Sequence, residues 1–196
     1  MQPHQARLLA LLEHFLPADD LEERHLEAIR ALVSSSADCF SRTHWVPGHI
    51  TGSAFIVDPA RRQMLLHHHK KLDRWLQMGG HDDGERDAAA TALREAREES
   101  GLAKVEWPPG ERRVLDVDVH EIPARKEDPA HQHHDVRFLF YAESTQPLSM
   151  DAQESNALAW IPLADAAAKM GEEGAKRVVA KIDRLLASHQ PPATSH

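Results

Sequence analysis

The spacing of apolar residues predicts helices at the start of the chain. Leucine and phenylalanine recur every three or four positions within residues 1–40, which is the spacing of one helix face. Pro17 interrupts this pattern, and Asp19 or Asp20 can cap a second helix after it. We therefore expect a helical extension over residues 1–44. Such a pair of helices either packs on the following domain or serves in a homodimer, and the sequence leaves both uses open.

Apolar runs between residues 45 and 163 predict strands. Residues 49–57 and 63–68 flank a turn at Asp58–Arg61, a pattern typical of a hairpin. Further strands are expected at residues 72–78, 113–122, 136–142 and 157–161. Residues 163–188 read as helical, with a break near Gly171–Gly174. This order predicts an α/β domain over residues 45–188 and a disordered tail over residues 189–196.

One predicted helix, residues 88–100, carries clustered carboxylates. Glu95, Glu98 and Glu99 are three and four positions apart, so they project from one face. The opposite face is apolar and consists of Ala89, Ala92, Leu93 and Ala96. Three carboxylates destabilise one another unless a cation neutralises them, and oxygen ligands suit Mg²⁺ or Mn²⁺. An acidic, solvated helix face is the alternative for these three residues taken alone.

The segment around this helix, residues 80–102, resembles the signature of the Nudix hydrolase superfamily. That signature is a Gly, five residues, a Glu, seven residues, then Arg-Glu-apolar-x-Glu-Glu-x-Gly-apolar. Its second half is matched throughout, by Arg94, Glu95, Ala96, Glu98, Glu99, Gly101 and Leu102. One position departs, because Arg86 stands where the signature has Glu. Glu85 or Asp87 can supply that carboxylate through a small shift of the loop.

The resemblance implies a fold and an activity. The fold is a Nudix-like α/β/α sandwich with a mixed β-sheet, preceded here by the helical pair. The activity is that of a Nudix-type pyrophosphohydrolase, a metal-dependent hydrolase that cleaves a diphosphate linkage in a nucleoside-diphosphate-linked or related small molecule. Water attacks phosphorus in such a reaction, and Mg²⁺ or Mn²⁺ activates the water and stabilises the charge.

The resemblance also implies the residues of the site. The catalytic residues carried over are Glu95, Glu98 and Arg94. The metal ligands carried over are the Gly79 carbonyl and the carboxylates of Glu95, Glu98, Glu99 and Glu154. Glu154 is placed by its position six residues before Trp160, and Asp151 is the alternative for this loop ligand.

Histidine is abundant, with 15 residues, and two clusters suggest metal binding, namely residues 67–69 and 131–134. Zinc sites often include cysteine, however, and the chain has a single one, Cys39. Contact with substrate is the favoured interpretation, since imidazole and guanidinium groups bind phosphate or a base edge. The candidates for this role are His81, His133, His134 and Arg137. Trp45, Trp75, Phe138 and Tyr141 could stack on a nucleobase, although aromatic residues in strands more often belong to the core.

Composition limits the partners. The net charge of −8 argues against long nucleic acid, whereas bound metal keeps a small phosphorylated substrate compatible. No apolar run reaches the length of about 18 residues that a membrane span requires. A single cysteine allows no internal disulfide and no signal peptide is evident, so the expected location is the cytoplasm.

Two other functions remain open at this stage. A non-catalytic Nudix-fold protein that binds or senses a ligand would be favoured by loss of a signature glutamate, yet Glu95, Glu98 and Glu99 are all present. A diphosphate isomerase on the same fold is expected to use a cysteine beside a glutamate. Cys39 is predicted to lie in a helix outside the core, which makes this interpretation weaker.

Overall fold

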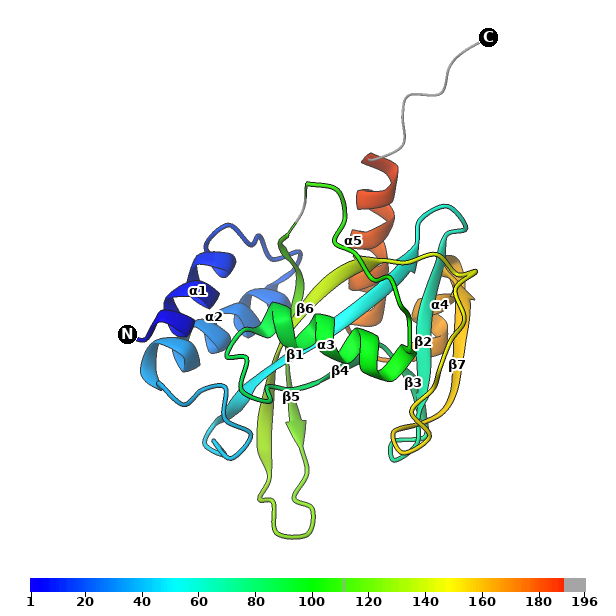
Figure 1. Ribbon diagram of the computed structural model, residues 1–196. Helices are drawn as coiled ribbons and strands as arrows, with labels where there is room; N and C mark the ends of the chain where they lie inside the picture. Colours follow the sequence, from blue (N-terminus) through cyan, green and yellow to red (C-terminus); the bar gives the residue numbers. More distant parts are fainter. Residues whose placement is uncertain (111, 189–196) are drawn as a thin grey trace.

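Seven strands form one mixed sheet with helices on both sides in the computed structural model, which describes residues 1–110 and 112–188 (Figure 1). The helices are α1 (Pro3–Glu13), α2 (Asp20–Ser35), α3 (Ala88–Ser100), α4 (Leu163–Met170) and α5 (Ala175–Ser188). The strands are β1 (Gly48–Asp58), β2 (Gln63–His69), β3 (Arg74–Leu76), β4 (Met78–His81), β5 (Val114–Ile122), β6 (His131–Tyr141) and β7 (Ser155–Pro162). The expected α/β/α sandwich with an N-terminal helical pair is confirmed. The predicted tail, residues 189–196, lies outside the described residues.

Strand β1 organises the sheet. One edge of β1 pairs in parallel with β6 from Gly48 to Val57. Its other edge is shared, because β4 pairs with Thr51–Ala54 and β2 pairs with Ile56–Asp58, both antiparallel. The strand order is β3-β2-β1-β6-β5, and β7 pairs with β2. This division of one edge brings the short glycine-containing strand β4 beside the middle of the sheet.

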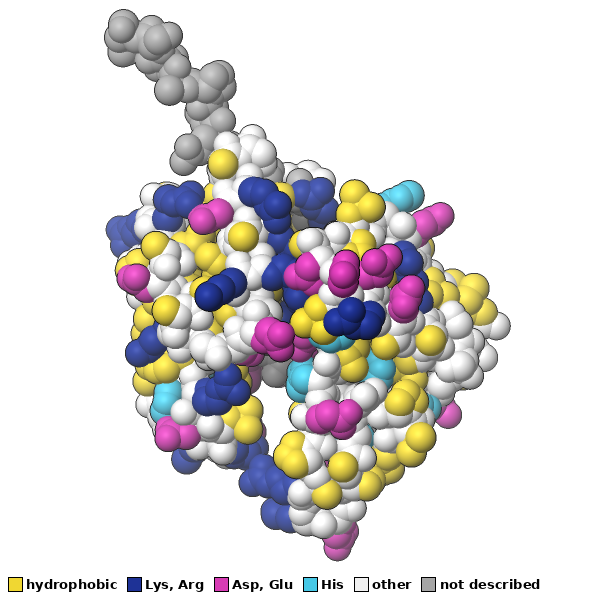
Figure 2. Space-filling model, turned by 180° about the vertical axis from the view of Figure 1, so that it is seen from behind, with side chains coloured by type: hydrophobic (Ala, Val, Ile, Leu, Met, Phe, Trp, Pro, Cys, Tyr) yellow, Lys and Arg dark blue, Asp and Glu magenta, His cyan; other side chains and the backbone are white. Residues whose placement is uncertain are grey.

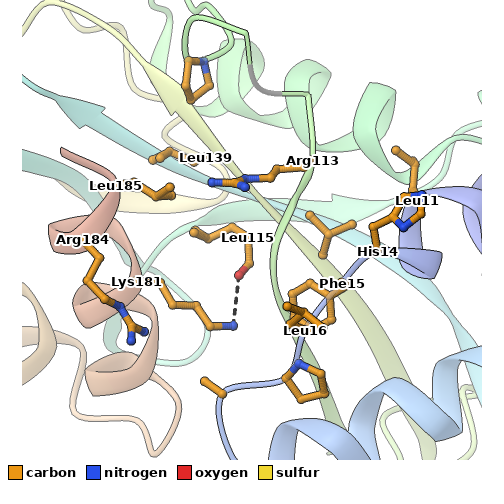
Figure 3. A pocket seen from close by; sticks show the side chains of 14 residues that line it. Leu11, His14, Phe15, Leu16, Arg113, Leu115, Leu139, Lys181, Arg184 and Leu185 are labelled. Carbon is orange, nitrogen blue, oxygen red and sulfur yellow. Dashed lines mark hydrogen bonds between the residues drawn. The ribbon is translucent and has the colours of Figure 1, made fainter. Parts of the chain in front are cut away.

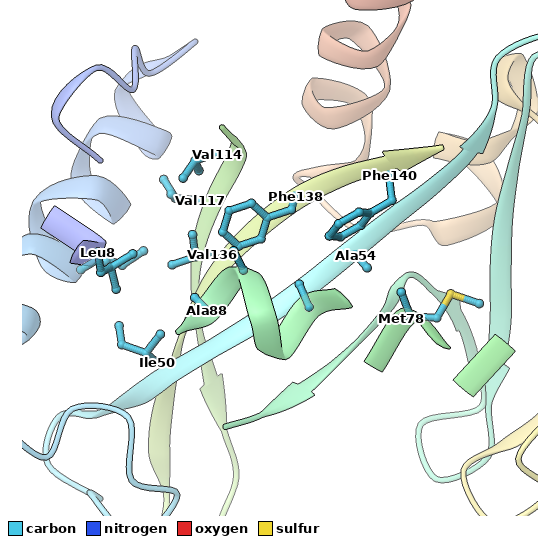
Figure 4. Packing of buried hydrophobic residues seen from close by; sticks show 14 of the residues in the cluster. Leu8, Ile50, Ala54, Met78, Ala88, Val114, Val117, Val136, Phe138 and Phe140 are labelled. Carbon is cyan, nitrogen blue, oxygen red and sulfur yellow. The ribbon is translucent and has the colours of Figure 1, made fainter. Parts of the chain in front are cut away.

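The helices divide the core into two parts. Apolar residues of α1, α2 and α3 pack with one set of sheet residues, which includes Ile50, Val136 and Phe138 (Figure 4). Residues of α4 and α5 pack with the alternate set, which includes Phe55 and Leu139. The alternation of side chains along β1 and β6 explains this division, since successive residues of a strand point to opposite faces.

The N-terminal helices pack on the sheet, which is one of the two uses left open by the sequence. Asp19 caps α2 by accepting a hydrogen bond from the Glu22 backbone N–H at 2.8 Å. Glu22 is itself fully buried and accepts the backbone N–H of Val117 in the edge strand β5 at 3.4 Å. Helix α2 therefore covers the β5 edge, which would otherwise expose unpaired backbone groups. Use of the pair in a homodimer, and a domain boundary after residue 44, stay predictions.

Two local expectations are corrected by the structure. Strand β6 begins at His131, not at Val136, because residues 131–135 pair with β5 on one side and residues 132–135 pair with β1 on the other. This polar run shows no apolar pattern, but the two neighbouring strands satisfy its backbone groups. Cys39 lies in a turn after α2 rather than in a helix, and it is fully buried in the core. No helix of the described chain is long and apolar enough to cross a bilayer.

Candidate active site

Helix α3 is fixed at both ends and along its apolar face. The Asp87 side chain accepts hydrogen bonds from the backbone N–H groups of Ala89 and Ala90 at 3.0 and 3.2 Å. Gly101 ends the helix in the left-handed region, at φ 68°, which favours glycine. The alanines of α3 face β1 so closely that a Cβ on Gly52 would lie 2.4 Å from the Ala88 carbonyl oxygen. The helix therefore has little freedom to move on the sheet.

Two of the three glutamates of α3 lie against the backbone of β4. The N–H of Gly79 donates to Glu99 Oε2 at 3.0 Å. A Cβ on Gly80 would lie 2.4 Å from Glu95 Oε1, so the absence of a side chain there leaves room for the Glu95 carboxylate. Glu98, by contrast, has a side chain that is 58% exposed. The face that the sequence predicted thus has an inner part, Glu95 and Glu99, and an outer part, Glu98.

The two inner carboxylates differ in their partners, because Arg94 Nη1 lies 3.0 Å from Glu95 Oε1. Burial raises the pKa of Glu99 to about 8, and the charges of Glu95, Glu154 and Asp151 act in the same direction. Burial also raises the pKa of Glu95. Within residues 1–110 and 112–188, no lysine or arginine forms an ion pair with Glu99. Buried carboxylates with these properties fit a divalent cation that prefers oxygen ligands, such as Mg²⁺ or Mn²⁺.

Arg94 holds the acidic groups around it in fixed positions. Its Nη1 donates to Glu98 Oε2 at 2.8 Å and to Glu95 Oε1 at 3.0 Å. Its Nη2 donates to the backbone carbonyl of His81 at 2.7 Å, which ties α3 to the end of β4. The geometry gives Arg94 the character of a positioning residue.

The loop before α3 supplies a carboxylate in place of the signature glutamate, whose position is occupied here by Arg86. Arg94 Nε donates to Glu85 Oε1 at 2.6 Å. Arg86 adopts a left-handed φ of 49°, and its backbone N–H donates to Asp82 Oδ1 at 2.6 Å, so the loop turns Glu85 toward Arg94. Asp87 is engaged as the cap of α3. Of the two carboxylates that the sequence offered, Glu85 is the one that contacts Arg94.

Glu154 lies next to the start of β7, where Lys71 Nζ approaches its Oε2 to 3.2 Å. Both partners are nearly half exposed. The charges of Glu154 and Asp151 both raise the pKa of Glu99. Either residue therefore remains a candidate for a further ligand.

The proposed substrate-binding residues divide into two groups. His81 Nε2 lies 3.2 Å from His133 Nε2, and burial lowers the pKa of both rings, that of His133 to about 2. His134 is 1% exposed and Arg137 is 2% exposed. Arg137 also donates to Asp135, Asp116 and Asp118 at 2.9, 3.4 and 3.0 Å. These bonds occupy the Arg137 guanidinium inside the protein, and His134 is buried. Neither side chain is therefore available to contact a substrate.

Sequence reasoning missed a buried ionic network beside this region. Asp116 of β5 is fully buried and accepts from Arg177 at 2.8 Å and from Lys181 at 3.0 Å, both on α5. Glu22 of α2 joins the same network through Lys181. The one signal in the sequence is the alternation of Asp116 and Asp118 with valines, which places both aspartates on one face of a strand.

The surface of the described residues is hollowed in several places. A cavity of about 470 Å³ lies between the α1–α2 connection, β5 and α5 (Figure 3). Its lining is largely apolar, and Lys181 there donates to the Leu115 carbonyl at 3.0 Å. None of the signature glutamates lines it. On the back of the molecule a second hollow opens below the centre, with histidine side chains beside it (Figure 2).

Several solved structures have a similar fold. The chain resembles an Ap4A hydrolase from C. elegans, with 17% identity, a TM-score of 0.56 and coverage of 71% of this chain and 98% of that one. It also resembles the E. coli dihydroneopterin triphosphate pyrophosphohydrolase, with 14% identity, a TM-score of 0.52 and coverage of 71% and 95%. A third similar structure is RenU, a Nudix hydrolase from M. smegmatis, with 17% identity, a TM-score of 0.52 and coverage of 73% of this chain and 88% of that one. A comparison with curated protein sequences found no match.

The family model of the NUDIX domain matches residues 48–182, which is most of the chain. Its range includes every strand of the sheet and the whole of the α3 site. The predicted fold and the predicted class of enzyme, a Nudix-type pyrophosphohydrolase, are thereby confirmed. The chain belongs to the Nudix family.

Proposed function

We propose that this Nudix protein is a metal-dependent hydrolase that cleaves a diphosphate linkage in a nucleoside-diphosphate-linked or related small molecule. The observation that carries the proposal is the buried Glu99, which lies against the Gly79 backbone without an ion pair to lysine or arginine among the described residues, beside the half-buried Glu95 at Gly80. The expected cofactor is Mg²⁺ or Mn²⁺, held by Glu95, Glu98, Glu99, the Gly79 carbonyl and Glu154.

Each residue has a part in the proposed reaction. When bound, the metal lowers the pKa of a water molecule and offsets charge on the phosphate oxygens. Glu99 and Glu95 supply the buried negative charge, and Glu98 supplies a carboxylate at the open side of the helix. Arg94 orients Glu95 and Glu98 through its hydrogen bonds. Contact of His81 and His133 with the substrate stays a prediction from the sequence.

The other two functions are less well supported. A diphosphate isomerase would need a reactive thiolate, but burial raises the pKa of Cys39 to about 11, so this thiol stays protonated. A non-catalytic ligand sensor is not favoured, because all the signature carboxylates of α3 are present and one of them, Glu99, is buried. We retain a small phosphorylated substrate and the cytoplasm as the expected partner and location.

A substrate screen tests the proposal directly. Metal-free protein would be offered nucleotide sugars, dinucleoside polyphosphates, dinucleotide cofactors and oxidised nucleotides, each with Mg²⁺, with Mn²⁺ and with excess EDTA. We expect hydrolysis of at least one class with either metal and none with EDTA. In ¹⁸O-labelled water, the label should appear in a phosphate product, because water attacks phosphorus.

The alternatives give different results in the same screen. Full turnover in excess EDTA would exclude a metal-dependent reaction. Tight binding of a compound without turnover, unchanged by Glu99→Gln, would favour the ligand sensor instead.

A further inference from the structure

Three histidines of two neighbouring strands converge at the start of the sheet. His49 of β1 lies directly opposite His133 of β6 in the parallel pairing. His131 is two residues before His133, so its side chain points to the same face. One ring nitrogen of each of the three lies within 4.8 Å of those of the other two. No other group of three or more metal-binding side chains this close occurs in the described part of the chain.

In two of the three rings, a hydrogen bond made by Nδ1 leaves Nε2 available to bind a metal ion. His49 Nδ1 donates to the backbone carbonyl of His44 at 3.3 Å, and His131 Nδ1 donates to that of Pro129 at 2.8 Å. A carbonyl oxygen only accepts, so the hydrogen of each neutral ring is on Nδ1 and the Nε2 lone pair is free. Metal-binding histidines in proteins are oriented by this same kind of bond from the second nitrogen.

The Nε2 atom of His49 is the independent sign that something is bound here. His49 is fully buried, and its Nε2 has no hydrogen-bond partner within the described residues. A buried polar atom left in this state costs free energy, and native proteins usually satisfy it. The His131 and His133 rings lie around it, with centroids 5.0 Å from that of His49 in each case. A cation at the centre of this group would satisfy the orphan nitrogen.

We propose that His49, His131 and His133 form a second metal site, separate from the carboxylates of α3, which binds Zn²⁺ or another borderline transition-metal ion. Imidazole nitrogens without a carboxylate suit Zn²⁺ and are poor ligands for Mg²⁺. Tetrahedral Zn²⁺ brings its nitrogen ligands to about 3.3 Å from one another, so the group contracts slightly on binding.

Three ligands leave a fourth position, and His81 is the residue beside it. Its Nε2 lies 3.2 Å from His133 Nε2, close enough to bind the ion or to hold a water molecule on it. The histidine site and the α3 site lie on opposite faces of the sheet. Helix α3 covers the face of β1 that contains Gly52, and alternation turns His49 to the opposite face.

Metal titration tests the site. Metal-free protein is titrated with Zn²⁺ by calorimetry, with Mg²⁺ in large excess so that the carboxylate site is occupied. The wild type should bind one high-affinity Zn²⁺ per chain. His131→Gln should weaken this binding by more than about tenfold, since a ligand is lost. The double variant His49→Gln/His131→Gln should abolish it.

A matched control removes the same number of imidazoles elsewhere. His14→Ala/His68→Ala lacks two histidines outside the group, and it should keep the wild-type stoichiometry and affinity. Wild-type behaviour in the His49→Gln/His131→Gln variant, or an equal loss in the control, would overturn the proposal.

Two measurements on the wild type do not depend on how well the variants fold. Zn²⁺ soaked into crystals should give one anomalous peak between the three rings. Co²⁺ should give the visible bands of a four- or five-coordinate nitrogen site with Mg²⁺ present. A peak confined to the α3 carboxylates, or no Co²⁺ bands under these conditions, would refute the site.

Discussion

Two clusters of buried carboxylates in this molecule differ in how their charge is balanced. Burial alone would raise the pKa of Asp116. The hydrogen bond from Arg177 and the charges of Arg137 and Lys181 instead lower this pKa to about 2. In the α3 site, Glu99 has a backbone N–H for a partner, and burial raises its pKa to about 8. Asp116 is thus balanced by cationic side chains of the fold, whereas Glu99 has no such partner among the described residues, because Arg94 pairs with Glu85, Glu95 and Glu98.

The difference separates a structural role from a functional one. The balanced network joins α2, β5, β6 and α5, so its charges hold the N-terminal helices to the sheet. The unbalanced site has its backbone fixed by the Asp87 cap and Gly101, while its charge is left for a ligand to neutralise. Buried acidic residues therefore indicate metal binding only where the protein supplies no counter-charge.

Breaking the balanced cluster should have the largest effect. Asp116→Asn leaves Arg137, Arg177 and Lys181 without a common carboxylate, and we expect a loss of about 3–5 kcal/mol in the free energy of unfolding. Urea denaturation measures this loss. The control is Asp183→Asn, in the exposed pair with Arg62, which should cost less than about 1 kcal/mol. Equal losses for both variants would contradict a structural role for the network.

In the unbalanced cluster, the same kind of change should spare stability and remove activity. Glu99→Gln and Glu98→Gln should each lower the rate of hydrolysis by about 100-fold or more, because each removes charge from the proposed metal site. Above about pH 8, where the buried Glu99 carboxyl is ionised, the metal-free Glu99→Gln protein should be at least as stable as the wild type. Steady-state kinetics and thermal unfolding check the two parts. Wild-type rates in both folded variants would show that α3 is not the catalytic site.

The pH dependence of stability should also reflect the unbalanced charge. An acid whose pKa is higher in the folded chain binds its proton more tightly there, so folding is favoured at low pH. For Glu99 this contribution is lost as the pH rises from its ordinary pKa of 4.5 to about 8. Relative to Glu99→Gln, the metal-free wild type should therefore lose several degrees of thermal midpoint across this window.

Added Mg²⁺ should restore the midpoint, most strongly near pH 8, where Glu99 is ionised and able to bind it. Calorimetric scans at several pH values, with Mg²⁺ and with EDTA, measure both effects. A wild type and a Glu99→Gln variant with parallel profiles would argue against the raised pKa of this carboxyl.

The loop before β7 provides a smaller test. Glu154 lies on an exposed loop and supports little of the core, so Glu154→Gln should lower kcat by roughly tenfold while leaving the thermal midpoint nearly unchanged. Asp151→Asn is the matched variant in the same loop. If Asp151→Asn lowers kcat and Glu154→Gln does not, the ligand is Asp151.

The smallest effect is expected at the position where the chain departs from the signature. Arg86→Glu should change the rate by no more than about threefold, because Glu85 already accepts the bond from Arg94 Nε. Glu85→Gln should have the larger effect of the two, since it removes that carboxylate. A strong gain of activity in Arg86→Glu would mean that Glu85 fills the position poorly.

Much of this protein was determined by local sequence. The caps of α2 and α3, the apolar stripe of α3 and the spacing of its glutamates follow from residues close together in the chain, and all are found in the structure. The resemblance to the Nudix signature rests on the same kind of information, because residues 80–102 form one contiguous segment. Whether Glu95, Glu98 and Glu99 act as predicted is for the variants above to decide.

Tertiary structure decided which groups meet across the chain. The parallel pairing of β1 with β6 brings His49 to His133, residues 84 positions apart that no local pattern connects. The antiparallel pairing of β6 with β5 places Arg137 beside Asp116 and Asp118, which turns a candidate for substrate binding into part of an ionic network. The assembled fold buries Glu99, which raises its pKa, and leaves Glu98 exposed, although the sequence predicts that both project from one helix face. Register and burial are properties of the assembled sheet, and neighbouring residues in a sequence carry little information about them.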